Sequence, residues 1–203
     1  MPTIIDMNKT LYIVKYTGQF GFIKPWTAVR DSETFSQQFL TPSIIEGIEK
    51  KLFPELLNEV GIKKIVGHRL SYSQISSQQE VIQTRGWNST RQGKQILFDR
   101  PKAILIRGVL QEPVLHLAFE SETDAEIAIK QHICLCRNED TMLPNFPMEV
   151  IDSKIFESDA EKYAGYELVF DKTEKSFLVG YHRLTNELMY GWLKIVGTPV
   201  KQF

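Results

Sequence analysis

Between Ile62 and Arg107 the chain combines positive charge with flat rings and amide side chains. Nine residues of this stretch are basic and two are acidic, and Tyr72 and Trp87 lie among them. Phosphates attract positive charge, whereas unpaired bases need flat faces and hydrogen-bond partners, so the stretch predicts contact with a nucleic-acid strand. The basic residues are Lys63, Lys64, Arg69, Arg85, Arg91, Lys94, Arg100, Lys102 and Arg107, and the amides are Gln74, Gln78, Gln79, Gln83, Asn88, Gln92 and Gln95.

Charge is segregated along the chain, although the formal net charge is only -1. Residues 1–61 contribute -1, residues 62–107 contribute +7, residues 108–172 contribute -9 and residues 173–203 contribute +2. This pattern predicts one face for a polyanion and another for a different partner, such as a basic protein neighbour. The alternative is a solvated surface on which like charges happen to cluster.

Cysteine and histidine give no metal-binding pattern. Cys134 and Cys136 are separated by one residue inside an apolar run, which matches neither a zinc knuckle nor a second Cys/His pair, so we expect structural thiols. The four histidines are scattered along the sequence. We therefore expect no metal and no cofactor.

Length and composition predict an ordinary globular protein. With 203 residues, of which 42% are hydrophobic and 11% aromatic, the chain can form one domain with an elaboration or two small domains. No run of eighteen apolar residues occurs, and the N-terminus lacks the pattern of a secretory signal. We expect a cytoplasmic protein with no membrane partner.

The first half of the chain predicts a strand, a long loop and a helix. Alternating β-branched and aromatic residues predict a strand over 11–16 that continues to Phe22, and residues 26–40 show no periodicity. Thr41-Pro42-Ser43 is typical of a helix start, and Ile44, Ile45, Ile48 and Leu52 follow helical spacing.

The second half predicts strands over 62–75, 96–98, 103–109, 114–119 and 148–156, with a projecting hairpin tip over 83–94. A capping box at Thr123 predicts a helix that runs to Cys134. The order is that of an α+β, ferredoxin-like (RRM-like) βαββαβ sandwich with an inserted β-hairpin. We expect this domain to span residues 1–156, with the insertion at about 76–102, and a small antiparallel β appendage to span 157–203.

Two motifs follow each other along the chain. The first motif consists of Gly18, Phe20, Phe22, Lys24-Pro25 and then Phe39-Leu40-Thr41-Pro42-Ser43-Ile44-Ile45 with Gly47-Ile48. The second motif runs from Arg100-Pro101-Lys102-Ala103 through Leu110 and Pro113-Val114 to Phe119. Together with the predicted architecture, which covers roughly residues 11–156, they resemble the fifth CRISPR-associated (Cas) protein family, a branch of the RAMP superfamily. The second motif is similar to that family's strand pair after its projecting thumb.

The resemblance implies a non-catalytic subunit of a CRISPR RNA-guided, Cascade-like complex of type I systems, which acts in antiviral defence. Such a subunit binds and caps the 5′ handle of the guide RNA (crRNA), contacts the backbone and large subunits, and meets target DNA only indirectly. The basic and aromatic segment lies where the family inserts its thumb. The residues agree independently with this expectation, because they too predict RNA contact.

Eleven residues are candidates for RNA contact. They form three groups: Lys24, Trp26 and Arg30, then Arg69, Tyr72, Gln78 and Gln79, and finally Arg85, Trp87, Arg91 and Lys94. The first group lies on the loop after the first strand, where the alternative is a solvated loop with one buried tryptophan. The second group lies on or just after the second strand, where Tyr72 is equally compatible with the core. The third group forms the tip of the hairpin, where Trp87 has no evident apolar face to join.

Two other functions remain open at this stage. One branch of the family, that of type I-C systems, cuts precursor guide RNA without metal, and here His68-Arg69 and Tyr72 would have to act as acid and base. However, the chain has no Lys-His pair and no tyrosine beside the helix start. A protein adaptor with the same fold, without RNA, is the third hypothesis, because this sandwich hosts unrelated functions. The glycine-rich loop of many related RNA-binding proteins is absent.

Overall fold

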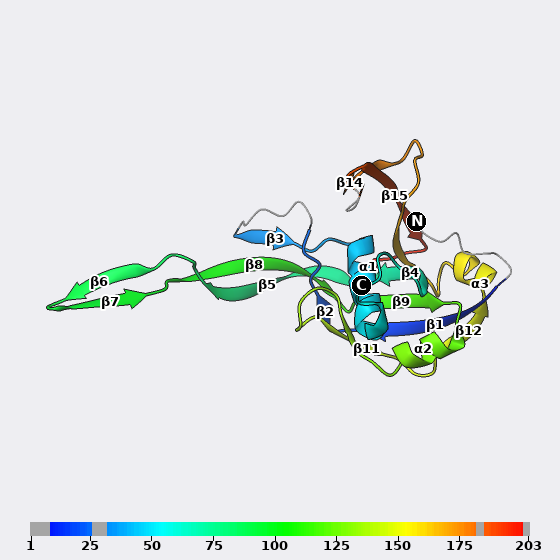
Figure 1. The fold of residues 1–203 in the computed structure, drawn as a ribbon, viewed down its shortest axis with the longest axis horizontal. Helices are drawn as coiled ribbons and strands as arrows, with labels where there is room; N and C mark the ends of the chain where they lie inside the picture. The colour runs from blue at the N-terminus through cyan, green and yellow to red at the C-terminus, as the bar shows by residue number, and fades with distance from the viewer. Residues whose placement is uncertain (1–8, 26–31, 182–184, 201–203) are drawn as a thin grey trace.

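An antiparallel sheet forms the body of the protein (Figure 1), and the computed structural model describes residues 9–25, 32–181 and 185–200. In its centre β1 pairs with β9 and β12, and β9 pairs with β4, so the order is β12-β1-β9-β4. This is the strand order of a βαββαβ sandwich, and the predicted α+β fold is confirmed. The four strands span Thr10–Thr17 (β1), Ile65–Ser71 (β4), Val114–Phe119 (β9) and Glu149–Asp152 (β12).

Two helices cover one face of this sheet, α1 over Pro42–Leu52 and α2 over Glu122–Ala128. Their apolar side chains share one buried cluster with those of the sheet, which includes Ile45, Ala125 and Phe119. The predicted start of α1 is confirmed, with Thr41 in extended conformation at the N-cap and proline in the first turn. At α2, the N-cap is Ser121, two residues earlier than the predicted Thr123, and its hydroxyl accepts a hydrogen bond from the amide of Asp124.

The prediction that the second helix runs to Cys134 was wrong. The helix ends at Ala128, whose carbonyl oxygen accepts a hydrogen bond from the buried hydroxyl of Tyr16 at 2.7 Å. Ile133–Cys134 (β10) pairs instead with Thr141–Pro144 (β11), which itself pairs with β1. Strand pairing therefore overrides a helical spacing of apolar residues at this point.

A third helix, α3 (Ser153–Ser158), helps to cover the opposite face of the sheet. Phe156 and Tyr163 pack there against Leu11, Ile13 and Ala118 in a second buried cluster. The prediction of one strand over 148–156 was therefore wrong in its second half. The side chain of Asp152 accepts a hydrogen bond from the amide of Lys154 at 2.8 Å and starts the helix instead.

The C-terminal strands extend the same sheet beyond β4. Tyr166 of β13 (Gly165–Val169) pairs with Leu70 of β4. On its other side β13 pairs with β15 (Leu188–Val196), which in turn pairs with β14 (Phe177–Tyr181). Figure 1 shows the β14–β15 pair rising away from the body. A side chain at Gly165 would meet the backbone amide of Leu70 at 2.8 Å, so glycine permits this close approach.

A buried carboxylate fixes the start of β4. Glu49 of α1 is fully buried and accepts hydrogen bonds from the backbone amides of Lys63, Lys64 and Ile65 at 2.6 to 3.1 Å. These bonds tie the chain that follows the short helix η1 (Pro54–Leu56) to α1. Charge-assisted hydrogen bonds of this kind are stronger than neutral ones, so Glu49 stabilises the connection between α1 and the sheet.

A long two-stranded ribbon projects from the body (Figure 1), and we call its strands, from Gln74 to Gln111, the thumb. The strands are β5 (Gln74–Gln83), β6 (Asn88–Gln92), β7 (Gln95–Asp99) and β8 (Lys102–Gln111). The inner strands, β5 and β8, pair from Gln74 with Gln111 to Gln83 with Lys102. The outer strands, β6 and β7, form the tip, which closes at Gly93, whose φ of 61° suits a tight hairpin turn.

Two short strands flank the base of the thumb. β2 (Phe20–Gly21) pairs with β8 in antiparallel orientation, and β3 (Glu33–Phe35) pairs with β8 in parallel orientation. The segment expected to be a loop up to Leu40 therefore contains a strand. Gly108 permits this pairing, since a Cβ there would lie 2.2 Å from the ring of Phe35.

Candidate nucleic-acid interface

The chain itself covers the face of the sheet opposite α1 and α2. In RRM-type domains such a sheet face carries aromatic side chains on which bases stack. Here Phe156 and Tyr163, both fully buried, occupy it together with the apolar residues of β1 and β9. A base therefore cannot reach the buried part of this face. The candidate residues fall into those buried in the body and those exposed on the thumb or at its base.

Arg69 lies inside the protein rather than on its surface. Its side chain is fully buried and donates to Glu157 at 2.9 Å and to Glu167, while its guanidinium lies 4.6 Å from the ring centre of Phe156. Lys194 of β15 completes the cluster through the same two glutamates. Burial raises the pKa of Glu167. Arg69 thus joins the C-terminal strands to the body, and we leave it out of the interface.

Tyr72 is also a core residue. It is 3% exposed, its hydroxyl donates to the side-chain oxygen of Gln38 at 2.5 Å, and its ring stacks on that of Tyr166 with 6.4 Å between centroids. Burial raises its pKa to about 12. The core alternative considered for Tyr72 therefore describes its position, and we leave it out of the interface as well.

The remaining candidates outside the tip are spread along the thumb and its base. Gln78 and Gln79 lie on β5 opposite Arg107 and Ile106, on the two different faces of the ribbon. Gln79 is exposed and Gln78 is half-buried, and Lys24 is exposed beyond β2. Trp26 and Arg30 lie outside the described residues.

The tip of the thumb brings three cations and a tryptophan to the surface. Arg85, Arg91 and Lys94 are exposed, and within residues 9–25, 32–181 and 185–200 none of them forms a salt bridge. Arg107, nearer the body, is by contrast paired with Glu80 at 3.3 Å. Unpaired cations on a ribbon that is surrounded by solvent are available to bind the phosphates of a polyanion.

Trp87 is 63% exposed, and Arg100 lies over its ring with the guanidinium carbon 5.4 Å from the centroid. The Nε of Arg100 donates to the carbonyl oxygen of Thr84 at 3.0 Å. Arg100 is not among the eleven residues predicted to contact RNA. The sequence does contain a signal for the contact between Arg100 and Trp87. A hairpin with its turn at Gly93-Lys94 places residues 87 and 100 opposite each other.

Sequence reasoning also missed the apolar surface of the thumb. Val81 and Ile104 lie opposite each other across the ribbon and are 64% and 57% exposed. Along β7, Ile96, Leu97 and Phe98 are exposed as well. Contiguous exposed apolar side chains of this kind commonly mark contacts with other proteins.

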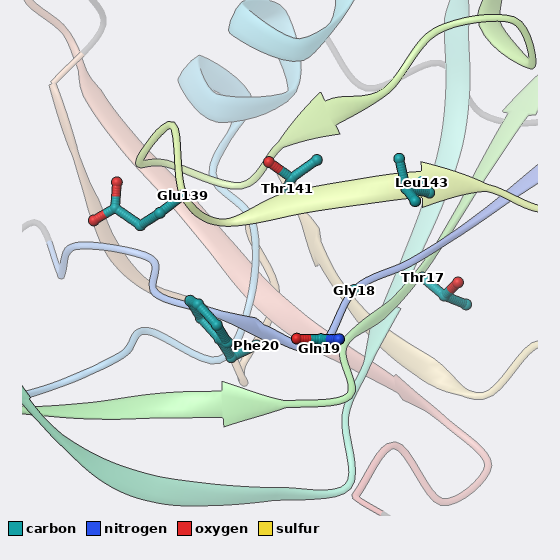
Figure 2. A pocket seen from close by; sticks show the side chains of 7 residues that line it. All are labelled: Thr17, Gly18, Gln19, Phe20, Glu139, Thr141 and Leu143. Carbon is teal, nitrogen blue, oxygen red and sulfur yellow. The ribbon is translucent and has the colours of Figure 1, made fainter.

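A hollow of about 460 Å³ lies beside the base of the thumb (Figure 2). Among the described residues that line it, Glu139 is the one charged side chain, and it lies 3.4 Å from the guanidinium of Arg137. Of the predicted RNA-contacting residues that the structure describes, none lines it, and a carboxylate does not favour a phosphate. The lining residues are Thr17, Gly18, Gln19, Phe20, Glu139, Thr141 and Leu143.

The residues considered for RNA cleavage are not presented to solvent together. The Nε2 of His68 is buried without a hydrogen-bond partner, and burial lowers the pKa of His68 to about 3. The hydroxyl of Tyr72 is held by Gln38. Among the residues that the structure describes, no group of three His, Cys, Asp or Glu side chains is arranged to hold a metal ion, and no helix is long and apolar enough to cross a membrane.

Comparison with known proteins gives a likeness of fold. No family model matches the chain, and no curated protein sequence matches it. Among solved structures, a chain described as "CRISPR RNA-guided surveillance complex" is similar to it, with a TM-score of 0.51 and 11% sequence identity. The match covers 94% of this chain and 90% of the other. At this identity the likeness establishes a shared fold over nearly the whole chain.

Proposed function

We propose that this protein is a non-catalytic subunit of a CRISPR RNA-guided surveillance complex and that its thumb binds the 5′ handle of the guide RNA. The observation that carries the proposal is the exposed tip, where Arg85, Arg91 and Lys94 have no carboxylate partner among the described residues and the ring of Trp87 is exposed. The two sequence motifs and the fold shared with a chain of such a complex support the same assignment.

The distribution of charge favours the thumb over the body as the RNA contact. From Gln74 to Gln111 there are six cations and two carboxylates, and one of these carboxylates is paired with Arg107. Cations attract the phosphates of a strand, while exposed amides such as Gln79 and Asn88 can bond to base edges. On the body, the sheet face that an RRM would use is covered by α3 and Tyr163.

Neighbouring subunits are the second class of partner that we propose. An isolated two-stranded ribbon is marginally stable in water, and this one exposes Val81, Ile104 and Phe98. Contact with a backbone or large subunit would cover these apolar side chains, while the cations of the thumb bind RNA. The thumb would then be stabilised by assembly.

The decisive experiment is co-expression with the genes encoded beside this one and with their repeat array. Purification through a tag on this chain is expected to recover further subunits and an RNA whose 5′ end derives from the repeat. Alanine at Arg85, Arg91 and Lys94 is expected to reduce the recovered RNA. Alanine at the exposed body residues Lys63, Lys130 and Lys154, which form no salt bridge in the described part of the chain, removes the same charge and serves as the matched control.

Recovery of the chain without RNA, or with RNA of random origin, would refute the proposal and favour an adaptor. Incubation of the purified protein with precursor guide RNA in EDTA tests the absence of catalysis. Intact RNA is expected, because the Nε2 of His68 is buried and the hydroxyl of Tyr72 is held by Gln38.

A further inference from the structure

The two faces of the Trp87 ring differ in what they meet. Arg100 lies over one face, yet the residue remains 63% exposed, so the exposed area belongs largely to the other face and the ring edges. The thumb offers Trp87 no apolar core to join, because every residue of β6 and β7 is exposed. A large flat ring held in water with one free face is suited to accept another flat ring.

Arg100 is itself held in place by the backbone of the facing strand. Its Nε donates to the carbonyl oxygen of Thr84, and the amide of Thr84 donates to the carbonyl oxygen of Pro101 at 2.9 Å. Together these hydrogen bonds join the two chain segments between the inner ribbon and the tip. Arg100 has no carboxylate partner among the described residues, so its charge stays available to the ring. The indole is thereby ordered before any ligand arrives, which lowers the entropy cost of binding.

We propose that Trp87, positioned by Arg100, is a stacking platform for one unpaired nucleobase of a single strand. The proposal rests on the proposed function, because it assigns the contact by which the thumb holds RNA. Arg85 and Arg91 flank the platform along the chain and are placed to meet the phosphates on either side of the stacked base. A duplex cannot use the platform, since its bases are already stacked on one another.

The first test compares Trp87→Ala with Phe98→Ala, which removes an equally exposed ring from the same tip. The probe is a fluorescein-labelled single-stranded RNA of twelve nucleotides and mixed sequence, alone or annealed to its complement. Trp87→Ala is expected to weaken single-strand binding by about 5- to 150-fold, the range that one stacked base provides, without changing the salt dependence. Phe98→Ala, and binding of the duplex to Trp87→Ala, are expected to change little.

The second test addresses the positioning role of Arg100. Arg100→Lys keeps the charge but loses the planar group that lies on the ring and reaches Thr84, so affinity should fall while the salt dependence stays the same. In the Trp87→Ala background the same change should have no effect, because Arg100 acts through the ring. Arg107→Lys is the control and should leave affinity unchanged, since Arg107 lies on the inner ribbon, is paired with Glu80 and does not lie over the Trp87 ring.

The outcomes separate this inference from the proposed function. If wild-type protein binds the RNA with a clear salt dependence and Trp87→Ala binds equally well, the platform is wrong and the proposed function stands. The platform is also wrong if Phe98→Ala loses as much affinity, or if Trp87→Ala keeps its RNA but loses neighbouring subunits on purification. Absence of any salt-dependent binding by the wild-type protein refutes the proposed function, and the platform with it.

Discussion

Replacing Arg85, Arg91 and Lys94 by alanine should flatten the salt dependence of RNA binding by a calculable amount. Five cations of the thumb have no carboxylate partner in the described structure, because of the six only Arg107 is paired. For a single strand the slope of log affinity against log salt is about -0.7 per neutralised phosphate. Five contacts give a slope of about -3.5, and two give about -1.4.

These slopes correspond to a large difference in a simple titration. Between 50 and 200 mM salt, wild-type protein should lose about 130-fold in affinity and the triple variant only about 7-fold. Fluorescence anisotropy with a labelled single-stranded RNA at four salt concentrations measures both slopes. The variant with alanine at Lys63, Lys130 and Lys154 has the same net charge and should keep the wild-type slope. If this control and the tip variant flatten the slope equally, binding follows net charge and the thumb is not the contact.

Three further changes test the fold that positions the thumb. Glu49→Gln should destabilise the protein by about 2 kcal/mol, seen as a thermal midpoint lowered by roughly 4–8 °C, because an uncharged acceptor replaces the carboxylate that holds three backbone amides. Gly108→Ala should cost about 1–3 kcal/mol in urea unfolding, because the new methyl group meets the ring of Phe35, and adding Phe35→Ala should restore stability. Burial lowers the pKa of His116 to about 4, so the unfolded chain binds a proton below pH 6.5 that the folded protein refuses until about pH 4. The contribution of His116 to stability should therefore fall by about 2 kcal/mol between pH 7 and pH 5, in addition to the loss from His68, whose pKa burial also lowers. His116→Phe should abolish the His116 part of the loss; a loss in the variant equal to that of the wild type would show that other groups cause it.

The parts of the fold that follow from local sequence were predictable. Thr41-Pro42 predicts the start of α1, because proline suits the first turn of a helix, and alternating residues predict β1, because burial on one face repeats every second position. The same local view extended the second helix to Cys134. Only the distant pairing of Ile133 with Met142 shows that this segment belongs to a sheet edge.

The candidate site was predictable where it is exposed and unpredictable where it is buried. Arg85 and Trp87 stand in a polar, glycine-containing stretch, so their exposure follows from composition. Arg69 has the same side-chain chemistry, but its partners Glu157 and Glu167 lie 88 and 98 positions further along the chain. No local pattern identifies such partners. A basic residue therefore predicts either a binding surface or an internal ion pair until the fold is known.

The register of the thumb makes its length an adjustable property. The inner strands contain ten consecutive pairs without a bulge, and each pair spans about 3.4 Å. Because side chains alternate between faces, removal or insertion of two pairs at a time keeps every remaining side chain on its original face. The tip can thus be moved by steps of about 7 Å towards or away from the body with its chemistry unchanged. A set of such variants would measure the distance at which the tip has to act, separately from what it binds.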